Sequence, residues 1–320
     1  MKTIFVVNPA AGQGKNTDKL ISLIQRAILH NNSDGFVYVT KSSGDATDFV
    51  KNYCMENGAA RFIACGGDGT LNEVLNGAID FCDAQVGVIP VGTGNDFCRN
   101  FDKSCNFLNV LNQLHGTSVV CDAIKFTTSL NGKIKSGYCL NMFNIGFDCN
   151  VADLTATMKK QPLVSGSLAY FISILFTLVR KKCSDLKIKV DDKVLHNGKL
   201  LLTSVANGSF CGGGIKSNPL ASVSDGMINI NIIKNVTRCK FISLLPLYMK
   251  GTFLGVKGIE KYIMSRKCKK LDIYPKKGAV RICIDGEIIS AEDIHFEIVP
   301  NAFNFVLPTS EAADREYTCV

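Results

Sequence analysis

The segment that most constrains the fold of this chain is FIACGGDGTLNEVLNG, residues 62–77. An apolar run stops at two glycines, and a helical pattern follows. Its apolar face comprises Leu71, Val74, Leu75, Ala78 and Ile79. This order predicts a strand, a tight corner and a helix that begins at Thr70, with Thr70 and Glu73 forming a capping box. Unpaired N–H groups at a helix start attract anions, and glycines let a phosphate approach the backbone.

Asp68 is the unusual residue of this corner, because a carboxylate repels a phosphate. It suits the site if a divalent cation lies between the two, as phosphoryl transfer requires. The alternative is a tight turn in which Asp68 accepts a hydrogen bond from its own backbone. This motif alone leaves both interpretations open.

Two further small-residue loops follow predicted strands in the first third of the chain, NPAAGQGK at 8–15 and PVGTGNDF at 90–97. Predicted strands at 3–7, 35–40, 61–65 and 86–90 alternate with helical patterns, which indicates a parallel sheet covered on both faces. Loops after parallel strands gather at one edge, where such folds bind ligands, so we expect a nucleotide there. Walker A and G-x-G-x-x-G spacings do not fit, and the protein-kinase motifs are absent.

The pattern changes after about Cys121. Turn signals at 131–132, 191–192, 197–198 and 285–286 separate β-rich runs, and helical stretches are predicted near 167–181 and 240–253. We therefore expect an α/β N-terminal domain with a parallel, Rossmann-like sheet at residues 1–121. A β-rich, antiparallel, sandwich-like second domain follows at 122–308, and a loose tail at 309–320.

Composition limits the class of protein. The chain is 46% hydrophobic and 20% charged, as expected of a globular protein. Fourteen cysteines form no C-x-x-C pair, and no signal peptide is evident, so we expect a reducing cytoplasm. The longest apolar run, 168–179, is shorter than the roughly 20 residues that span a bilayer.

Five motifs occur in a fixed order: NPAAGQGK, GGDGTLNE, PVGTGNDF, SDG at 224–226 and DGE at 285–287. From Asn8 to about Pro308 the chain resembles soluble bacterial diacylglycerol kinases, within the lipid-kinase family that also includes sphingosine and ceramide kinases. NAD kinase is a more distant relative. The resemblance implies an NAD kinase/diacylglycerol kinase-like fold. It also implies an ATP- and Mg²⁺-dependent kinase that converts diacylglycerol to phosphatidic acid.

The resemblance also implies functional residues. Those for ATP are Asn8, Pro9, Ala10, Ala11, Gly12, Thr40, Gly66, Gly67, Asp68, Gly69, Thr70, Leu71, Asn72 and Thr93. Asp68 would act on Mg²⁺ with Asp96 in support, and a second metal would be held by Ser222, Asp225 and Met227. Glu287 is the expected catalytic carboxylate, because it has the longer reach, and Asp285 its partner. Without the resemblance, ordinary turns explain both SDG and DGE.

The lipid-binding parts are less constrained. The apolar helix at 168–179 lines an acyl groove or, as we prefer, lies in the core. Residues 257–277 carry eight Lys/Arg against two acids. This stretch is either a solvated basic face or a peripheral contact with the anionic inner membrane surface, through Arg266, Lys267, Lys269 and Lys270. We expect no nucleic-acid partner, and a homodimer is an open alternative.

Three rival functions remain at this point. The first is a kinase for another lipid alcohol, such as a sphingoid base or phosphatidylglycerol. The second is an NAD kinase, which the PVGTGNDF loop disfavours. The third is a nucleotide-binding regulator without turnover, against which the intact acids at 68, 225, 285 and 287 argue.

Overall fold

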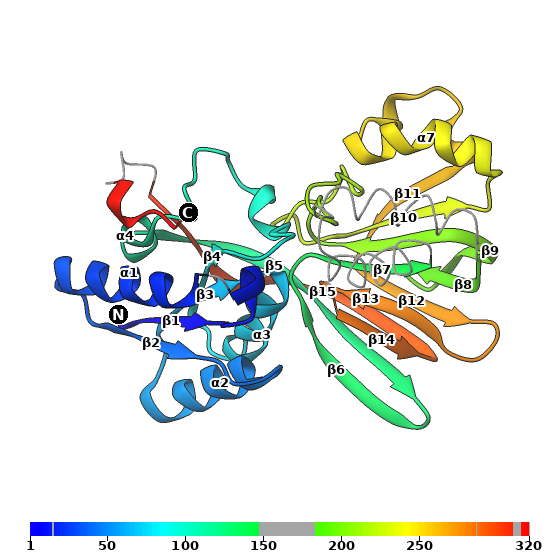
Figure 1. Ribbon diagram of the computed structural model, residues 1–320. Helices are drawn as coiled ribbons and strands as arrows, with labels where there is room; N and C mark the ends of the chain where they lie inside the picture. The colour runs from blue at the N-terminus through cyan, green and yellow to red at the C-terminus, as the bar shows by residue number, and fades with distance from the viewer. Residues whose placement is uncertain (15, 147–182, 286, 310–314, 320) are drawn as a thin grey trace. The chain divides into compact units, whose positions relative to one another are not determined.

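The computed structural model describes residues 1–14, 16–146, 183–285, 287–309 and 315–319, and only the backbone of residues 13, 287 and 315 (Figure 1). The chain forms two compact units. Unit 1 comprises Met1–Asp122 and Asn301–Val320, and unit 2 comprises Ala123–Pro300. The first crossing lies one residue from the predicted boundary. Residues 301–308, expected in the second domain, instead return to unit 1.

Unit 1 is built on a parallel sheet, as predicted. Its strands are β1 (Thr3–Val7), β2 (Gly35–Val39), β3 (Arg61–Gly66) and β4 (Gln85–Pro90), in the order β2-β1-β3-β4. The end of the long strand β15 (Asp293–Leu307) adds to the far edge, where Asn304 pairs in parallel with Gln85 of β4. This pairing explains why the chain returns to unit 1.

Helices cover both faces of this sheet. Figure 1 draws α1 (Thr17–His30) on one side, and α2 (Asp45–Asn57) and α3 (Asp68–Ala78) on the other. Ile24 and Ala27 of α1 share a core with Phe5 of β1 and Ile63 of β3. Helix α2 ends at Asn57, and Gly58 after it has a φ of +81°, which glycine adopts readily.

The C-terminal segment also packs on unit 1. The short 3₁₀ helix η5 (Arg315–Tyr317) leads to Thr318, which bridges to Asn109, just before the helix α4 (Val110–Leu114). The backbone N–H of Cys319 donates to the carbonyl of Leu108 at 2.8 Å. These residues are therefore docked, which differs from the predicted loose tail.

Unit 2 is antiparallel and β-rich, which confirms the predicted fold class. Its strands follow the order β14-β13-β7-β9-β8-β12-β15. Their bounds are β7 (Met142–Gly146), β8 (Ser184–Val190), β9 (Lys193–Ala206), β12 (Lys270–Pro275), β13 (Val280–Ile284) and β14 (Glu287–Ala291). Strand β10 (Ile228–Lys234) pairs with β9 and with β11 (Ile263–Cys268), and β5 (Thr117–Leu130) pairs with β6 (Lys133–Cys139).

The predicted turns fare differently. Asn131 and Gly132, at φ +49° and +73°, join β5 to β6, and the predicted turn at 191–192 joins β8 to β9. The predicted turn at 197–198 is wrong, because both residues lie inside β9 and Gly198 pairs with Leu186. The predicted helix near 240–253 is α7 (Arg238–Lys250), whereas the apolar stretch 168–179 lies outside the described residues.

Within the described parts of the chain, no helix has the length and apolar character needed to cross a membrane.

Candidate active site

Three loops meet at the carboxyl ends of β1, β3 and β4 in unit 1, as the parallel sheet predicted. They are the first loop (residues 8–14), the second loop (66–70) and the third loop (90–97), and we call them together the three-loop site. The side-chain amide of Asn8 donates to the Thr70 hydroxyl at 3.0 Å, which joins the first loop to the second. The backbone N–H of Gly92 donates to the carbonyl of Gly66 at 3.2 Å, which joins the third.

Thr40, the expected contribution of β2, follows at the same edge, where its N–H donates to the carbonyl of Val7 at 2.9 Å. The residues expected to bind ATP in unit 1 therefore lie at neighbouring strand ends, in the loops that follow them and in the first part of α3.

Helix α3 begins at Asp68, so the predicted start at Thr70 and its capping box are wrong. The residue before the helix is Gly67, in an extended conformation and without a side-chain cap. The hydroxyl of Thr70 is buried and accepts from Asn8 instead of capping. Glu73, the other member of the predicted box, accepts from the Ser43 hydroxyl at 3.4 Å. Asp68 thus occupies the first turn of α3, where the helix dipole favours a negative charge.

The carboxylate of Asp68 ties the second loop to the third. Its Oδ1 accepts from the backbone N–H groups of Asp96 at 2.8 Å and Phe97 at 3.2 Å. These donors lie 28 and 29 residues away, so this is not the local turn considered as the alternative.

The space above Gly94 is shared by two carboxylates. A Cβ built on Gly94 would meet Asp68 Oδ2 at 2.8 Å and Asp96 Oδ2 at 3.3 Å. Carboxylate oxygens are the ligands that Mg²⁺ prefers. The Asp68–Asp96 pair therefore fits a divalent cation beside phosphates bound at the start of α3.

Glycine is required where the second and third loops touch. A Cβ on Gly92 would lie 2.3 Å from the Cα of Gly67, closer than any real contact. The two backbones can approach this closely because Gly92 lacks a side chain, whereas a Cβ on Gly67 would meet the Cα of Gly92 at an ordinary 3.4 Å.

The thiol of Cys98 reports the electrostatics of this site. Burial raises its pKa and the negative charge of Asp68 raises it further, whereas the charge of Arg99 lowers it by more than that of Asp96 raises it. The Nε of Arg99 lies 3.5 Å from Asp96 Oδ1. The surroundings of Asp68 are therefore negative, which favours a bound cation.

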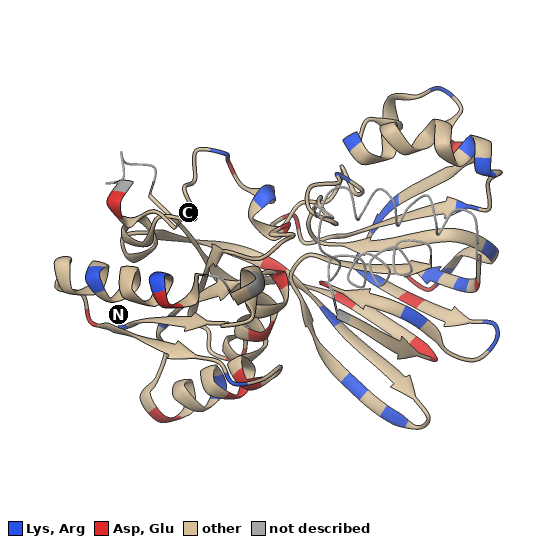
Figure 2. Cartoon of the chain, in the orientation of Figure 1, with Lys and Arg blue, Asp and Glu red and all other residues tan. Residues whose placement is uncertain are grey.

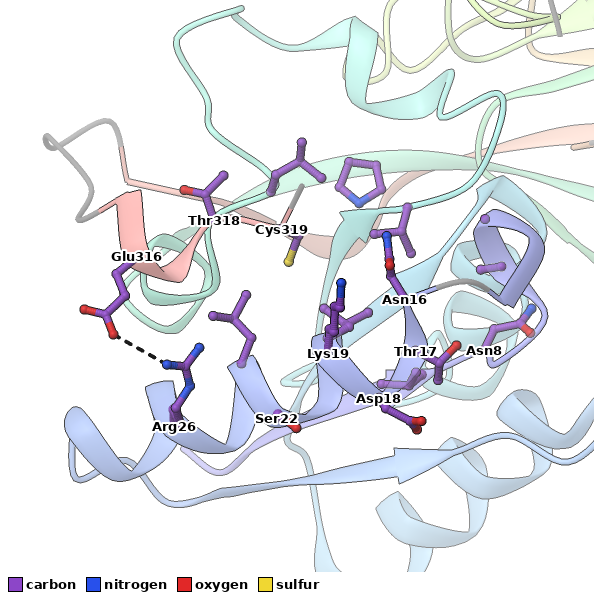
Figure 3. A pocket seen from close by; sticks show the side chains of 18 residues that line it. Asn8, Asn16, Thr17, Asp18, Lys19, Ser22, Arg26, Glu316, Thr318 and Cys319 are labelled. Atoms are coloured by element: carbon purple, nitrogen blue, oxygen red, sulfur yellow. Dashed lines mark ion pairs between the residues drawn. The ribbon is translucent and has the colours of Figure 1, made fainter. Parts of the chain in front are cut away.

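A cavity of about 1000 Å³ adjoins the first loop (Figure 3). It lies between α1, the segment Pro90–Val91 and the C-terminal residues 316–319, and an ion pair of Arg26 with Glu316 at 3.5 Å lies at its edge. Of the residues expected to bind ATP, Asn8, Ala11 and Gly12 line it. The second loop does not, so the cavity overlaps the three-loop site only at the first loop.

In unit 2, Asp285 forms the turn between β13 and β14, with a φ of +43°. Its side chain is 9% exposed. Oδ1 accepts from the N–H of Met142 at 2.8 Å, and Oδ2 accepts from Leu140 at 3.0 Å and Asn141 at 3.4 Å. Asp285 therefore braces the turn against the start of β7. Glu287 opens β14 and pairs through its backbone with Ile284.

The segment 207–214 contacts the residues just before β7, and our sequence analysis assigned it no role. The N–H groups of Asn207 and Gly208 donate to the carbonyl of Asn141, and the side-chain amide of Asn141 donates to the carbonyl of Phe210 at 2.7 Å. Three consecutive glycines, 212–214, have positive φ. The signal present in the sequence is the glycine run at 212–214.

Asp225 lies at the same end of the unit 2 sheet. Met142, Ala206 and Asn229 are neighbours in register across β7, β9 and β10, and Asp225 precedes β10 by three residues. Its Oδ1 accepts from the N–H of Met227 at 3.1 Å, and its Oδ2 pairs with the ammonium group of Lys267. Ser222 lies in the same turn segment. This donor set fits a metal ion only when Lys267 moves away.

The residues predicted to contact a membrane are partly neutralised. All four residues are exposed, but Lys267 pairs with Asp225, and Lys270 pairs with Glu297 at 3.3 Å. In the portions of the chain that are described, no group of three or more His, Cys, Asp or Glu side chains is arranged to hold a metal.

Comparison with known proteins gives two family matches. Residues 2–126 match the diacylglycerol kinase catalytic domain, and residues 141–307 match the YegS C-terminal NAD kinase beta sandwich-like domain. Proteins named "Probable lipid kinase YegS-like", from Yersinia pestis (strain Pestoides F) and Yersinia pseudotuberculosis serotype O:1b (strain IP 31758), are 29% identical over 293 residues. These alignments cover 89% of this chain and 92% of each relative.

Two solved structures from Bacillus anthracis str. Sterne share the fold. One, described as a diacylglycerol kinase, has a TM-score of 0.69 at 20% identity and covers 97% of both chains. The other has a TM-score of 0.72 at 22% identity and covers 97% of this chain and 98% of that one.

Proposed function

Because the chain belongs to the lipid kinase family that joins a diacylglycerol kinase catalytic domain to a YegS-type NAD kinase-like domain, we propose that it transfers the γ-phosphoryl group of ATP to the free hydroxyl of diacylglycerol. The product is phosphatidic acid. The observation that carries this proposal is the three-loop site, where two carboxylates face one space beside the start of α3. The names of the relatives support a lipid as the acceptor.

The three-loop site accounts for the nucleotide. The phosphates lie against the start of α3 and the glycines of the second loop, where backbone and dipole favour an anion. Asp68 and Asp96 hold the divalent cation, which offsets the phosphate charge during transfer. Asn8 fixes Thr70, so the first loop keeps its position relative to the second.

We assign the catalytic base to Glu287. Its carboxylate takes the proton of the lipid hydroxyl, the hydroxyl oxygen forms a bond to the γ-phosphorus, and the bond to the β–γ bridging oxygen breaks to release ADP. Asp285 supports this residue indirectly, because its own carboxylate is engaged by three backbone N–H groups.

The protein would reach its substrate as a peripheral protein at the cytoplasmic face of the membrane. The exposed cations Arg266 and Lys269 are then partners for anionic lipid. The ion-paired Lys267 and Lys270 contribute less.

In the deciding experiment, the purified protein is incubated with labelled ATP and Mg²⁺. Each incubation contains one acceptor: diacylglycerol, phosphatidylglycerol, a sphingoid base or NAD. Labelled phosphatidic acid as the main product supports the proposal. Labelling of another lipid alcohol retains the lipid kinase but overturns diacylglycerol as the substrate. Labelled NADP, or ATP hydrolysis without any labelled acceptor, overturns the lipid kinase.

A further inference from the structure

Helix α7 and the segment after it form an unusual surface on unit 2, which we call the α7 face (Arg238–Lys261). In Figure 2 the middle of α7 carries no charged residue, whereas the basic residues lie at its ends and in the segment that follows. A surface helix of a globular protein normally presents charged residues to water. Between the exposed Arg238 and Lys250 at its two ends, the exposed positions of α7 are Cys239, Ile242, Ser243 and Pro246.

Large apolar side chains stand out from this surface. Ile242 is 53% exposed, and Leu254 and Val256 in the following segment are 39% and 37% exposed. The segment that bears Leu254 packs on α7, because the rings of Tyr248 and Phe253 lie 5.9 Å apart. Apolar side chains exposed on adjoining elements are a feature of surfaces that contact a partner or a membrane.

The inner side of α7 packs into a hydrophobic core. Phe241, Leu244 and Tyr248 are buried in a core that also contains Phe253. The Thr237 hydroxyl caps the first turn by accepting from the N–H of Lys240, and Gly251 closes the last turn at a φ of +70°. The exposed apolar side chains are therefore mounted on a rigid element.

The charge of the α7 face is strongly positive. Its only acid is Glu260, and its basic residues are Arg238, Lys240, Lys250, Lys257 and Lys261. Among the described residues, Lys250, Lys257 and Lys261 have no carboxylate partner. Cations around exposed apolar side chains complement an anionic bilayer, where the cations meet headgroups and the apolar groups enter the acyl boundary.

We propose that the α7 face docks the protein on anionic membranes, with Ile242 as its central apolar contact. This inference rests on the proposed lipid kinase activity, since a diacylglycerol acceptor resides in a bilayer. It differs from contact through Arg266–Lys270, because those cations have no exposed large apolar side chain among them. The competing occupant of the same face is a second copy of this chain.

The test is sedimentation with vesicles of phosphatidylcholine, with and without phosphatidylserine, in the absence of ATP. We expect the wild type to bind the phosphatidylserine vesicles and to lose binding in high salt. Ile242→Glu should lower the partition coefficient at least about tenfold, and Lys250→Glu with Lys257→Glu by about as much. The matched control is Val194→Glu, a residue of β9 that is 55% exposed, which should bind as the wild type does.

Three further readouts keep the outcomes distinct. Turnover of a water-soluble short-chain diacylglycerol should be unchanged in Ile242→Glu. If neither the wild type nor any variant phosphorylates this substrate, the kinase proposal is wrong, and the vesicle-binding measurement still tests the docking proposal. Wild-type vesicle binding by Ile242→Glu overturns the docking proposal. So does gel filtration showing a wild-type dimer that becomes a monomer in Ile242→Glu while vesicle binding is unaffected, because the face is then an interface between copies.

Discussion

The corner at Asp68 in unit 1 and the turn at Asp285 in unit 2 are two Asp-Gly dipeptides that serve different purposes. Each carboxylate accepts backbone N–H groups from a loop distant in sequence. Asp285 is buried and uses both oxygens on three donors. Asp68 is half-buried, uses Oδ1 for its two backbone donors, and directs Oδ2 toward the space that it shares with Asp96. The Asp-Gly motif alone therefore does not distinguish a structural carboxylate from a metal-binding one. The distinction depends on the hydrogen-bond donors that the fold brings to each carboxylate from distant parts of the sequence.

The largest effect should come from Asp68→Ala. We expect turnover to fall at least about 10³-fold, equivalent to about 4 kcal/mol in activation free energy. The reason is that the cation loses a carboxylate ligand and then no longer offsets the phosphate charge. The fold should persist, because Asp68 is only half-buried and its carboxylate accepts from N–H groups of a loop. Steady-state kinetics with circular dichroism checks this, and the exposed Asp48→Asn on α2 is the control. Wild-type turnover in Asp68→Ala would remove the metal role.

The structural role of Asp285 should appear as a loss of stability when its carboxylate is removed. Asp285→Ala leaves buried N–H groups at 140–142 without an acceptor, at a cost of about 1–3 kcal/mol each. We therefore expect the free energy of unfolding to fall by about 3 kcal/mol or more in a urea titration. The exposed Asp34→Ala is the control. A loss below about 0.5 kcal/mol would show that the turn does not need this carboxylate.

Glu287→Gln tests whether Glu287, and not Asp285, is the catalytic base. Loss of a general base typically slows turnover by about 10²–10⁴-fold, so we expect kcat to fall at least about 10²-fold with ATP affinity and stability little changed. Asp285→Asn is the matched comparison. If Glu287→Gln turns over normally while Asp285→Asn is inactive yet stable, the two carboxylates have the opposite roles.

Gly94→Ala tests the shared space above the third loop. The new methyl group would press on Asp68 Oδ2 and Asp96 Oδ2. We expect about a tenfold rise in the Mg²⁺ concentration needed for half-maximal activity, with stability changed by about 1 kcal/mol or less. Gly255→Ala in unit 2, where a Cβ also meets nothing within 4 Å, is the control. An unaltered Mg²⁺ dependence would place the cation elsewhere.

The smallest effect concerns the second metal position that the sequence assigned to Asp225. Lys267 and a cation compete for the same carboxylate oxygen. In Lys267→Met, millimolar Mg²⁺ should raise Tm by about 2–4 °C more than in the wild type, while Lys269→Met should not differ from it. An identical Mg²⁺ shift in all three proteins would argue against a metal at Asp225.

The predictable parts of this molecule are those set by local pattern. Strand patterns placed β1, β3 and β4 near their observed bounds, and the turn at 131–132 followed from Asn-Gly chemistry. The errors arise from long-range contacts. The hydroxyl of Thr70 was expected to cap its helix, but Asn8, 62 residues away, binds it. Likewise, pairing with β8 keeps Gly198 within a strand.

The same distinction applies to the site. The sequence identified the acids at 68 and 285, but not their partners, because the donors at 96–97 and 140–142 meet them only in the fold. The return of residues 301–307 to unit 1 has the same cause, since it depends on the pairing of β15 with β4.

The central claim is that ATP and its metal belong to the three-loop site and that Asp285 is structural. Calorimetric titration of Mg·ATP into the wild type, Asp68→Asn and Asp285→Asn tests it most directly. We predict that Asp68→Asn weakens binding at least about tenfold, equivalent to about 1.4 kcal/mol, whereas Asp285→Asn stays within about twofold of the wild type. Equal affinity in all three proteins, or a loss confined to Asp285→Asn, would contradict the account.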